Sequence, residues 1–485
     1  MRMKNNQITP LRRRRITWIT PCKRSAARGR SAAHKFILTV ITLVCTITTV
    51  LAQPTSFHSD FTKGKTGALP EGWSLTAYWP ERAPHFVLSE DQSGRYLSLT
   101  GCGDSSAVAY ISTKTRLTPG TYQYKALFSI SGDVNPQRNL LFQCKTRTHD
   151  GIFKFYRLGN GMVEGRETII VSGNQPIDAE IRIFYRFHPA GEVKIREISI
   201  TPAEPVEPRW VRFACTKGRV KTGDYDQMAA IAGQAAKDNA DLLLFSEMVS
   251  QADNDASQGE TVMNLLSKLA AQYHIYVGAS VYVIDKTDGR KYNRGALFDR
   301  TGKLVGIYDK IHPYSPEVNE GGITPGAKTA IFQTDFGKVG MIICYDSWFT
   351  DVTQLFALKG AEVILFPVAG CYRSLLHARA ADNQVRFVCS IFNGYGIFDT
   401  AGRDVQDPEK DPTINTSGNT FKDVRTFEVN YMGLLCASLD LNCNISPHYN
   451  GGTMRESPGG KRNRDDQLLY LDDLIKKEKE RWWIE

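Results

Sequence analysis

The sequence predicts a multi-domain protein in which an N-terminal antiparallel β-sandwich, jelly-roll-like, precedes an α/β domain. Three observations point to this. The chain has 485 residues, more than one ordinary domain. Apolar and polar residues alternate in short runs through 53–205, as they do in half-buried strands. After Pro208, helical patterns interleave with apolar runs, which is typical of a layered α/β domain.

Residues 1–52 are predicted to be a secretory signal peptide. They contain eleven Lys or Arg and no Asp or Glu, and their basic part runs into the apolar stretch 36–51, which ends in Val50-Leu51-Ala52. We expect cleavage near Gln53 and a secreted or periplasmic protein. An uncleaved signal anchor is the alternative, although about 16 residues are short for a span of roughly 20.

The net charge of +9 comes from this leader, because it falls to −2 once those eleven basic residues are removed. A nearly neutral chain has no basic face for nucleic acid. No pair of cysteines has the spacing of a metal site, so we expect no metal.

The β-sandwich module is assigned to 53–205. Its strand-like runs are 96–99, 107–111, 121–126, 140–143, 168–171, 181–185 and 193–200. The aromatic residues Trp73, Tyr78 and Trp79 are candidates for stacking on a saccharide, with plain core or edge packing as the alternative. Prolines 202, 205 and 208 mark the linker that follows.

The α/β domain is assigned to 206–485, including a helical tail over 464–485. Its expected order is a strand, a helix, a buried strand, a helix and a strand, at 211–215, 224–239, 241–246, 261–273 and 276–282. The pair Trp482 and Trp483 suggests docking of the tail on a neighbouring surface.

A cysteine ends one apolar run at a predicted strand-to-helix elbow. The run 339–343 stops at Cys344, and a helix is expected over 351–358. At such an elbow a thiol faces a cleft, and the helix N–H groups favour a thiolate. A buried core cysteine is the alternative.

Two further ionisable residues end apolar runs. Glu247 follows 241–246, and Lys310 follows 304–309. A lone glutamate or lysine in such a place is more often a solvated surface charge. However, open α/β sheets gather their sites at strand ends, so an acid, a base and a thiol there predict one shared site.

The order of these residues and the short sequence motifs around them resemble those of the carbon–nitrogen hydrolase (nitrilase) superfamily. The matching segments are 244–247, 308–312 with 322–326, and 340–346, supported by 360–367, 378–383 and 396–402. The resemblance extends from about 209 to 440 and leaves 53–205 outside it.

The resemblance implies a four-layer α-β-β-α sandwich and a Glu-Lys-Cys triad of Glu247, Lys310 and Cys344, without metal or organic cofactor. It also implies a further pocket glutamate, Glu317 or Glu320, of which we favour Glu317. A homodimer or higher homo-oligomer would form through helices beside the site, with Phe349, Leu355 and the tail tryptophans as candidate surface and core packing of these residues as the equal alternative.

The chemistry expected from this triad is hydrolysis of a non-peptide carbon–nitrogen bond in a small amide or ureide. Cys344, its pKa lowered by Lys310, would form a thioester while Glu247 moves the protons. Lys310 and the Tyr345 N–H would hold the oxyanion. Further candidate pocket residues are Tyr345, Trp348, Tyr372 and Arg373, the last as partner of a substrate carboxylate, with a plain surface role as the equal alternative.

Three other functions remain open or less favoured. An N-acyltransferase would pass the same thioester to an amine, and a secreted glycan-binding protein would carry an inactive hydrolase-like domain. A papain-like protease needs a Cys–His pair, for which His312, His377 and His448 are available, but a lone histidine is more often structural.

Overall fold

The computed structural model describes residues 55–146, 149–152, 154–171, 173–406, 420–445 and 453–455. The predicted signal peptide and the predicted tail helix with Trp482 and Trp483 lie outside these residues, so both stay predictions. No helix within the described ranges is long and apolar enough to cross a membrane.

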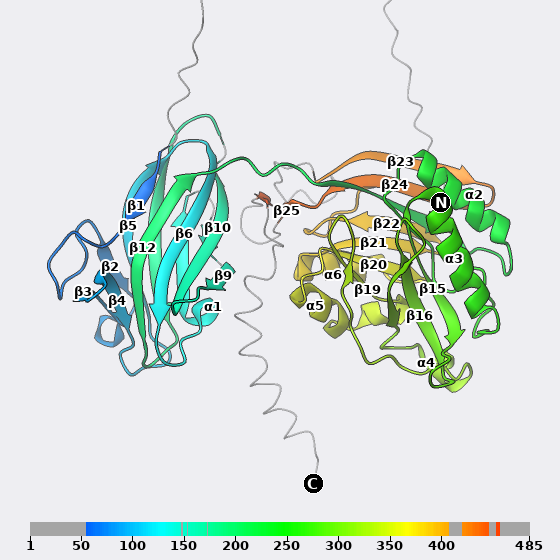
Figure 1. Ribbon diagram of the computed structural model, residues 1–485, viewed down its shortest axis with the longest axis horizontal. Helices are drawn as coiled ribbons and strands as arrows, with labels where there is room; N and C mark the ends of the chain where they lie inside the picture. The colour runs from blue at the N-terminus through cyan, green and yellow to red at the C-terminus, as the bar shows by residue number, and fades with distance from the viewer. Residues whose placement is uncertain are drawn as a thin grey trace, which may run out of the picture. The chain divides into compact units, whose positions relative to one another are not determined.

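The N-terminal part consists of two antiparallel sheets (Figure 1). The first has the order β3-β4-β12-β6-β10-β9, with β1 paired to β12. Its strands are β1 (Phe57–Ser59), β3 (His85–Asp91), β4 (Gly94–Thr100), β6 (Gly120–Ile130), β9 (Lys154–Arg157), β10 (Met162–Val171) and β12 (Glu192–Pro202).

The second sheet has the order β2-β5-β11-β7-β8. Its strands are β2 (Ser74–Ala77), β5 (Val108–Leu117), β7 (Leu140–Lys145), β8 (His149–Ile152) and β11 (Ile177–Arg186). The short helices of this part are η1 (Pro80–Arg82) and α1 (Pro136–Asn139).

The period-two pattern of the sequence is what builds these sheets. In β6, Tyr122, Tyr124, Ala126 and Phe128 are buried and the residues between them are not, because successive side chains of a strand point to opposite faces. The buried residues of both sheets form one apolar cluster. The prediction of antiparallel strands over 53–205 is confirmed for the described residues.

The predicted saccharide-binding aromatics fall into two groups. Trp73 packs against Phe57 and Phe61, with ring centroids 6.4 and 5.9 Å away. Tyr78 and Trp79 are 70% and 50% exposed. Trp73 therefore has the packing role that was the alternative, and only Tyr78 and Trp79 are available to a ligand.

The α/β part contains six of the helices that the structure describes. They are α2 (Tyr225–Lys237), α3 (Gly259–Tyr273), α4 (Ser315–Asn319), η2 (Cys344–Trp348), α5 (Asp351–Leu358) and α6 (Arg373–Asn383). The strands are β13 (Trp210–Lys217), β14 (Leu242–Leu244), β15 (Tyr276–Ile284), β16 (Lys291–Phe298), β17 (Leu304–Asp309), β18 (Phe332–Gln333), β19 (Lys338–Met341), β20 (Val363–Val368), β21 (Arg386–Ile391), β22 (Gly394–Phe398), β23 (Phe421–Val429) and β24 (Met432–Asp440). A separate hairpin joins β25 (Cys443–Ile445) to β26 (Thr453–Arg455).

The main sheet has the order β17-β16-β15-β14-β13-β21-β20-β19-β18, with β22 beside β21 and β24 between β13 and β23. Its two halves meet at a single pair in register, Lys217 with Ile391. Ser390 reinforces this junction, because its hydroxyl donates to the Leu244 carbonyl (2.6 Å) and accepts from the Thr216 N–H (2.9 Å).

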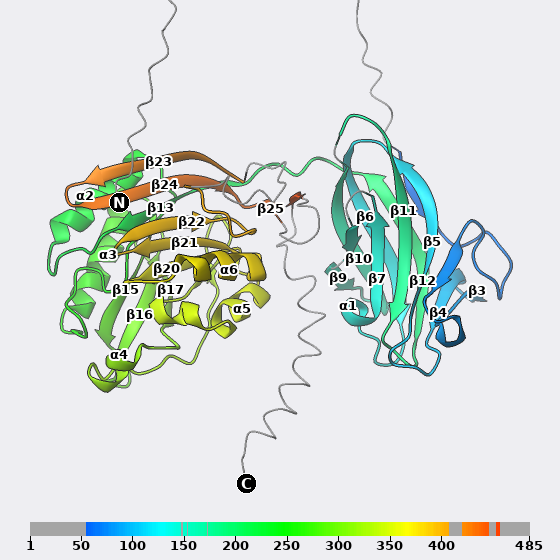
Figure 2. The same cartoon turned by 180° about the vertical axis from the view of Figure 1, so that it is seen from behind.

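Each half of the sheet carries its own pair of helices (Figure 2). The side chain of Asp224 caps α2 by accepting from the Gln227 N–H (3.1 Å). The buried side of α2, Met228, Ile231, Ala232 and Ala235, shares an apolar cluster with α3 and the strands β13 to β16. Residues of α5 and α6 join the cluster of β19 to β21.

Cys344 does not end a strand, so the predicted run 339–344 is wrong at its end. Strand β19 stops at Met341, and Cys344 opens the 3₁₀ turn η2. The helix expected over 351–358 is present as α5, but it begins seven residues after the cysteine. The thiol therefore does not sit at the N-terminus of that helix.

Candidate active site

Glu247 lies just beyond β14 and is almost completely buried. Its Oε1 accepts from Lys310 Nζ (3.0 Å) and from Asn293 Nδ2 (2.9 Å). Its Oε2 accepts from the backbone N–H of Ala369, just after β20 (2.9 Å). Three donors therefore hold the carboxylate in one orientation.

Lys310 follows β17 and is 1% exposed. Its Nζ lies between two carboxylates, at 3.0 Å from Glu247 and 2.6 Å from Glu317. Burial alone would lower the pKa of Lys310, but the charges of the two carboxylates, Glu247 first, outweigh it, and the pKa lies above its usual range. Lys310 is a permanent buried cation.

Glu317 in α4 is the second carboxylate beside Lys310. Its Oε1 accepts from Asn293 Nδ2 (2.8 Å) and the Tyr282 hydroxyl (3.1 Å), and its Oε2 accepts from the Tyr314 N–H (2.7 Å). Burial would raise the pKa of Glu317, but Lys310 and these hydrogen bonds hold it below the usual range. Glu320, the alternative, is exposed at the end of α4 and is not brought to this cluster.

The Cys344 thiol reaches the same cluster from the other half of the sheet. Its Sγ lies 3.8 Å from the carbonyl oxygen of Gly370. Burial, followed by the charge of Glu247, raises the pKa of Cys344, and the opposite effect of Lys310 is smaller. The expected lowering of this pKa is therefore wrong for the resting site, because desolvation of the half-buried thiol and the neighbouring carboxylate outweigh the effect of Lys310.

Cys344 has a left-handed backbone conformation, with φ at +44°. An L-residue with a side chain is strained there by about 1–2 kcal/mol, and glycine is not. We expect Cys344→Gly to be more stable than Cys344→Ala by about 1 kcal/mol in urea unfolding of the full chain.

The matched control for this strain is Cys389 in the extended strand β21, where glycine should be less stable than alanine by about 0.5–1 kcal/mol. The same order of stability at both positions would contradict strain at Cys344.

Asp346 ties the cysteine turn to the lysine loop. Its Oδ2 accepts from the Ile343 N–H (2.9 Å) and the Tyr308 hydroxyl (2.8 Å), and its Oδ1 accepts from the His312 N–H (2.8 Å). Burial raises the pKa of Asp346 to about 6 against these hydrogen bonds. The segments that carry Lys310 and Cys344 are thus joined through one buried carboxyl group.

The sequence pattern did not predict two buried residues of the site, Asn293 in β16 and Tyr282 in β15. Asn293 donates to both glutamates, while its Oδ1 accepts from the Ser280 hydroxyl (3.0 Å). The available signal was a polar residue at a buried position of a strand, Tyr292-Asn293-Arg294, but a single asparagine does not stand out without its partners.

We expect Asn293→Ala to lower the free energy of unfolding by about 1–3 kcal/mol, because two buried carboxylates each lose a donor. Urea unfolding measures this loss. The control is Asn442→Ala at a partly exposed asparagine whose amide donates to the Glu207 carbonyl (2.9 Å), which should cost less than about 1 kcal/mol. Equal losses would contradict a special role of Asn293.

Three of the candidate pocket residues, Tyr345, Trp348 and Tyr372, lie together, whereas Arg373 is paired with another residue. Tyr345 follows Cys344 in η2, Trp348 ends η2, and the ring of Tyr372 packs edge-on against Trp348 at 5.2 Å. Arg373 forms an ion pair with the buried Asp404 and donates to the Tyr395 carbonyl (3.1 Å). Arg373 thus has a partner within the chain, which leaves little reason for a substrate carboxylate to bind it.

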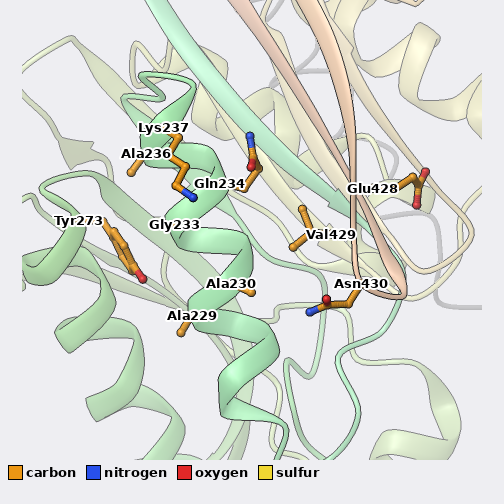
Figure 3. Close-up of a pocket in the computed structure, with 10 residues that line it drawn as sticks. All are labelled: Ala229, Ala230, Gly233, Gln234, Ala236, Lys237, Tyr273, Glu428, Val429 and Asn430. Atoms are coloured by element: carbon orange, nitrogen blue, oxygen red, sulfur yellow. The ribbon is translucent and has the colours of Figure 1, made fainter.

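Within the described ranges no group of His, Cys, Asp or Glu side chains is arranged to hold a metal ion. A hollow of about 760 Å³ lies elsewhere, between α2, Tyr273 of α3 and the turn that joins β23 to β24 (Figure 3). None of the predicted site residues lines it.

Comparison with known proteins relates this region to one family. Residues 217–394 match the sequence model of the carbon–nitrogen hydrolase family. Omega-amidase NIT3 of Saccharomyces cerevisiae is 32% identical over 140 residues, 26% of this chain and 48% of that protein. Citrullinase of Francisella tularensis is 33% identical over 152 residues, 28% of this chain and 52% of that protein. The chain thus spans about half the length of these two curated relatives.

Similar solved structures include a carbon–nitrogen hydrolase from Helicobacter pylori G27, with a TM-score of 0.43 and 17% identity over 55% of this chain and 99% of that one. An amidase from Nesterenkonia sp. has a TM-score of 0.40 and 19% identity over 51% and 94%. The family model and the curated relatives thus relate residues 217–394 of this chain to the carbon–nitrogen hydrolases.

Proposed function

We propose that the protein hydrolyses the carbon–nitrogen bond of a small amide or ureide through a thioester on Cys344. Glu247 is the general base and acid, Lys310 stabilises the developing oxyanion, and Glu317 positions Lys310. The observation that carries this proposal is the convergence of Glu247, Lys310 and Glu317 within hydrogen-bond distance beside the Cys344 thiol.

In the first half of the reaction, Cys344 Sγ attacks the carbonyl carbon while its proton passes to Glu247. The raised pKa of Cys344 supports this coupled transfer, because the thiolate forms only as the carboxylate takes the proton. Lys310 Nζ faces the negative charge on the former carbonyl oxygen. The carbon–nitrogen bond then breaks, and Glu247 returns the proton to the leaving nitrogen.

In the second half, water attacks the thioester carbon. Glu247 takes a proton from this water, the carbon–sulfur bond breaks, and the proton goes back to the sulfur. The products are a carboxylic acid, or a carbamic acid from a ureide, together with ammonia or an amine. No metal or organic cofactor enters these steps.

Intact-mass spectrometry of acid-quenched full-length enzyme tests the proposal with a panel of amides, ureides and nitriles. We expect an adduct with the mass of the acyl group, released by hydroxylamine and mapped to the peptide with Cys344. A Cys344→Ala variant should show neither adduct nor ammonia release. Undiminished ammonia release by this variant would refute Cys344 as the nucleophile.

The same measurement separates hydrolysis from acyl transfer. With an amine added in excess, an N-acyltransferase would turn the adduct into a new amide, whereas the proposed hydrolase still yields mainly the acid. A protein with an inactive hydrolase-like domain would give no adduct with any substrate of the panel.

We also infer the architecture of the two domains, export of the protein and its oligomeric state. We infer a jelly-roll-like sandwich for 53–205, supported by two sheets that share one apolar cluster. We infer a four-layer α-β-β-α sandwich for 206–485, supported by the helix pairs on the two halves of the main sheet. We also propose export by residues 1–52, and a homo-oligomer whose surface includes Phe349 and Leu355, which are 37% and 44% exposed.

A saccharide site on the N-terminal part is a second proposal, supported by the exposed pair Tyr78 and Trp79, whose ring centroids are 6.4 Å apart. Exposed aromatic rings of this kind can stack on the apolar face of a sugar. Retardation in native gels containing soluble polysaccharides should be lost in Trp79→Ala. Equal retardation of variant and wild type would contradict this site.

A further inference from the structure

Five aromatic side chains form a continuous, branched row around Tyr345, the residue that follows the nucleophile. We call Tyr314, Tyr345, Trp348, Phe349 and Tyr372 the aromatic rim. Ring centroids are 5.4 Å apart for Tyr314 and Tyr345, 5.9 Å for Tyr345 and Trp348, 5.5 Å for Tyr345 and Phe349, and 5.2 Å for Trp348 and Tyr372. The row draws on three segments: the approach to α4, the η2 turn with Phe349 after it, and the start of α6.

Two residues of the rim lie close to the reacting cysteine along the chain or through the Gly370 segment. Tyr345 is the residue after Cys344, and Tyr372 comes two residues after Gly370, whose carbonyl lies 3.8 Å from Cys344 Sγ. Trp348 is 48% exposed and Tyr372 is 62% exposed. Contiguous exposed apolar rings on a soluble domain commonly mark a binding surface.

The basic side chains next to the rim already have partners. Arg373 is paired with the buried Asp404. Arg379 forms an ion pair with Asp382 (3.7 Å) and donates from Nη2 to the Trp348 carbonyl (3.5 Å), while its buried Nε has no hydrogen-bond partner within the described residues. A substrate carboxylate at the rim would therefore lose its hydration without gaining an uncommitted cation, whereas a flat apolar group would gain ring contacts.

We propose that the substrate is an amide carrying a planar aromatic group, which packs between Trp348 and Tyr372 of the aromatic rim, face-on to one ring and edge-on to the other. The structure favours this group over a substrate with a carboxylate in its place. This inference rests on the proposed amide hydrolysis and specifies its substrate class.

The test measures kcat/KM of the full chain for four amides. Phenylacetamide carries the ring on the acyl side, N-benzylacetamide carries it on the amine side, propionamide has no ring, and succinamic acid carries a carboxylate. We expect one of the two ring compounds to exceed propionamide, and succinamic acid to fall below it. The better ring compound identifies the side of the amide that contacts the rim.

The variants Trp348→Ala and Tyr372→Ala should lower the ratio of kcat/KM for that ring compound to kcat/KM for propionamide by about tenfold. Trp348→Phe should restore most of the ratio, because it keeps a ring. The control is Tyr431→Ala, which removes a ring of 42% exposure whose hydroxyl donates to Asp224, and should leave the ratio unchanged.

Binding of the same four compounds to Cys344→Ala by calorimetry gives a readout that needs no turnover. Ring compounds that bind no better than propionamide would overturn the aromatic substrate class, even if hydrolysis is normal. An unchanged ratio in the rim variants, with a changed sedimentation coefficient, would also overturn it and assign the rim to a subunit contact. Absence of hydrolysis together with preferential binding of the ring compounds would instead refute only the proposed reaction.

Discussion

Lys310→Met is expected to lower the free energy of unfolding by about 3–5 kcal/mol and to abolish measurable amide hydrolysis. The physical reason is the pair of carboxylates on either side of the ammonium group, at 3.0 and 2.6 Å. Methionine fills a similar volume but leaves Glu247 and Glu317 buried next to each other without a counter-ion. Urea unfolding of the full chain, together with an ammonia assay, measures both losses.

The stability of Lys310→Met should change with pH in the direction opposite to that of the wild type. In the wild type the pKa of Glu317 is lowered, so its contribution to stability is present above its unfolded pKa and is lost only as the pH falls through the lower folded pKa. The raised pKa of Lys310 contributes stability that is complete below its usual value and is lost only at higher pH.

Without Lys310, burial dominates and raises the pKa of Glu317 above its unfolded value. Protonation then favours the folded variant, so its stability should decrease as the pH rises from 5 to 8. The control is Lys359→Met, at an exposed lysine that donates to Thr329, which should change stability by less than about 0.5 kcal/mol. A pH-independent loss in Lys310→Met would contradict the buried ion cluster.

Glu247→Gln is expected to reduce kcat/KM by about 10²–10⁴-fold while making the Cys344 thiol more reactive toward iodoacetamide. The amide of glutamine cannot accept the thiol proton, so hydrolysis slows. The charge and hydrogen bond of Glu247 are, after burial, among the main causes of the raised pKa of Cys344, and Lys310 acts against them. Their removal therefore lowers the pKa of the thiol and raises the thiolate fraction at neutral pH.

The two rates are measured on the same protein, hydrolysis by ammonia release and alkylation by mass spectrometry of the peptide with Cys344. Alkylation that slows in parallel with hydrolysis would contradict the coupled role of Glu247. The control is Glu428→Gln, at an exposed glutamate near the turn that joins β23 to β24, which should alter neither rate.

Several parts of this site could be predicted because their signals are local. Glu247 and Lys310 were predicted because each ends an apolar run with an ionisable residue, which costs free energy to bury. Glu247 lies three residues after β14, and Lys310 lies one residue after β17. The alternation in β6 and the amphipathic pattern of α2 likewise predict which face is buried. These patterns depend on the chemistry of neighbouring residues alone.

Other parts could not be predicted because they depend on contacts between distant segments. The pKa of Cys344 depends on whether Glu247 or Lys310 has the larger effect, and burial adds to the effect of Glu247. Asn293 gains its role only when three other segments place Glu247, Glu317 and Ser280 around its amide. Arg373 seemed available to a substrate because its partner, Asp404, is 31 residues away in the sequence.

The single register pair between Lys217 and Ile391 also bears on how the protein should fail under stress. The carboxylates and the ammonium group come from one side of this seam, and the sulfur comes from the other. A small displacement of the two halves of the sheet at this junction would separate Cys344 from Glu247, while the helices and strands on either side stay folded. On heating, the enzyme should therefore lose activity several degrees below the temperature at which circular dichroism detects unfolding.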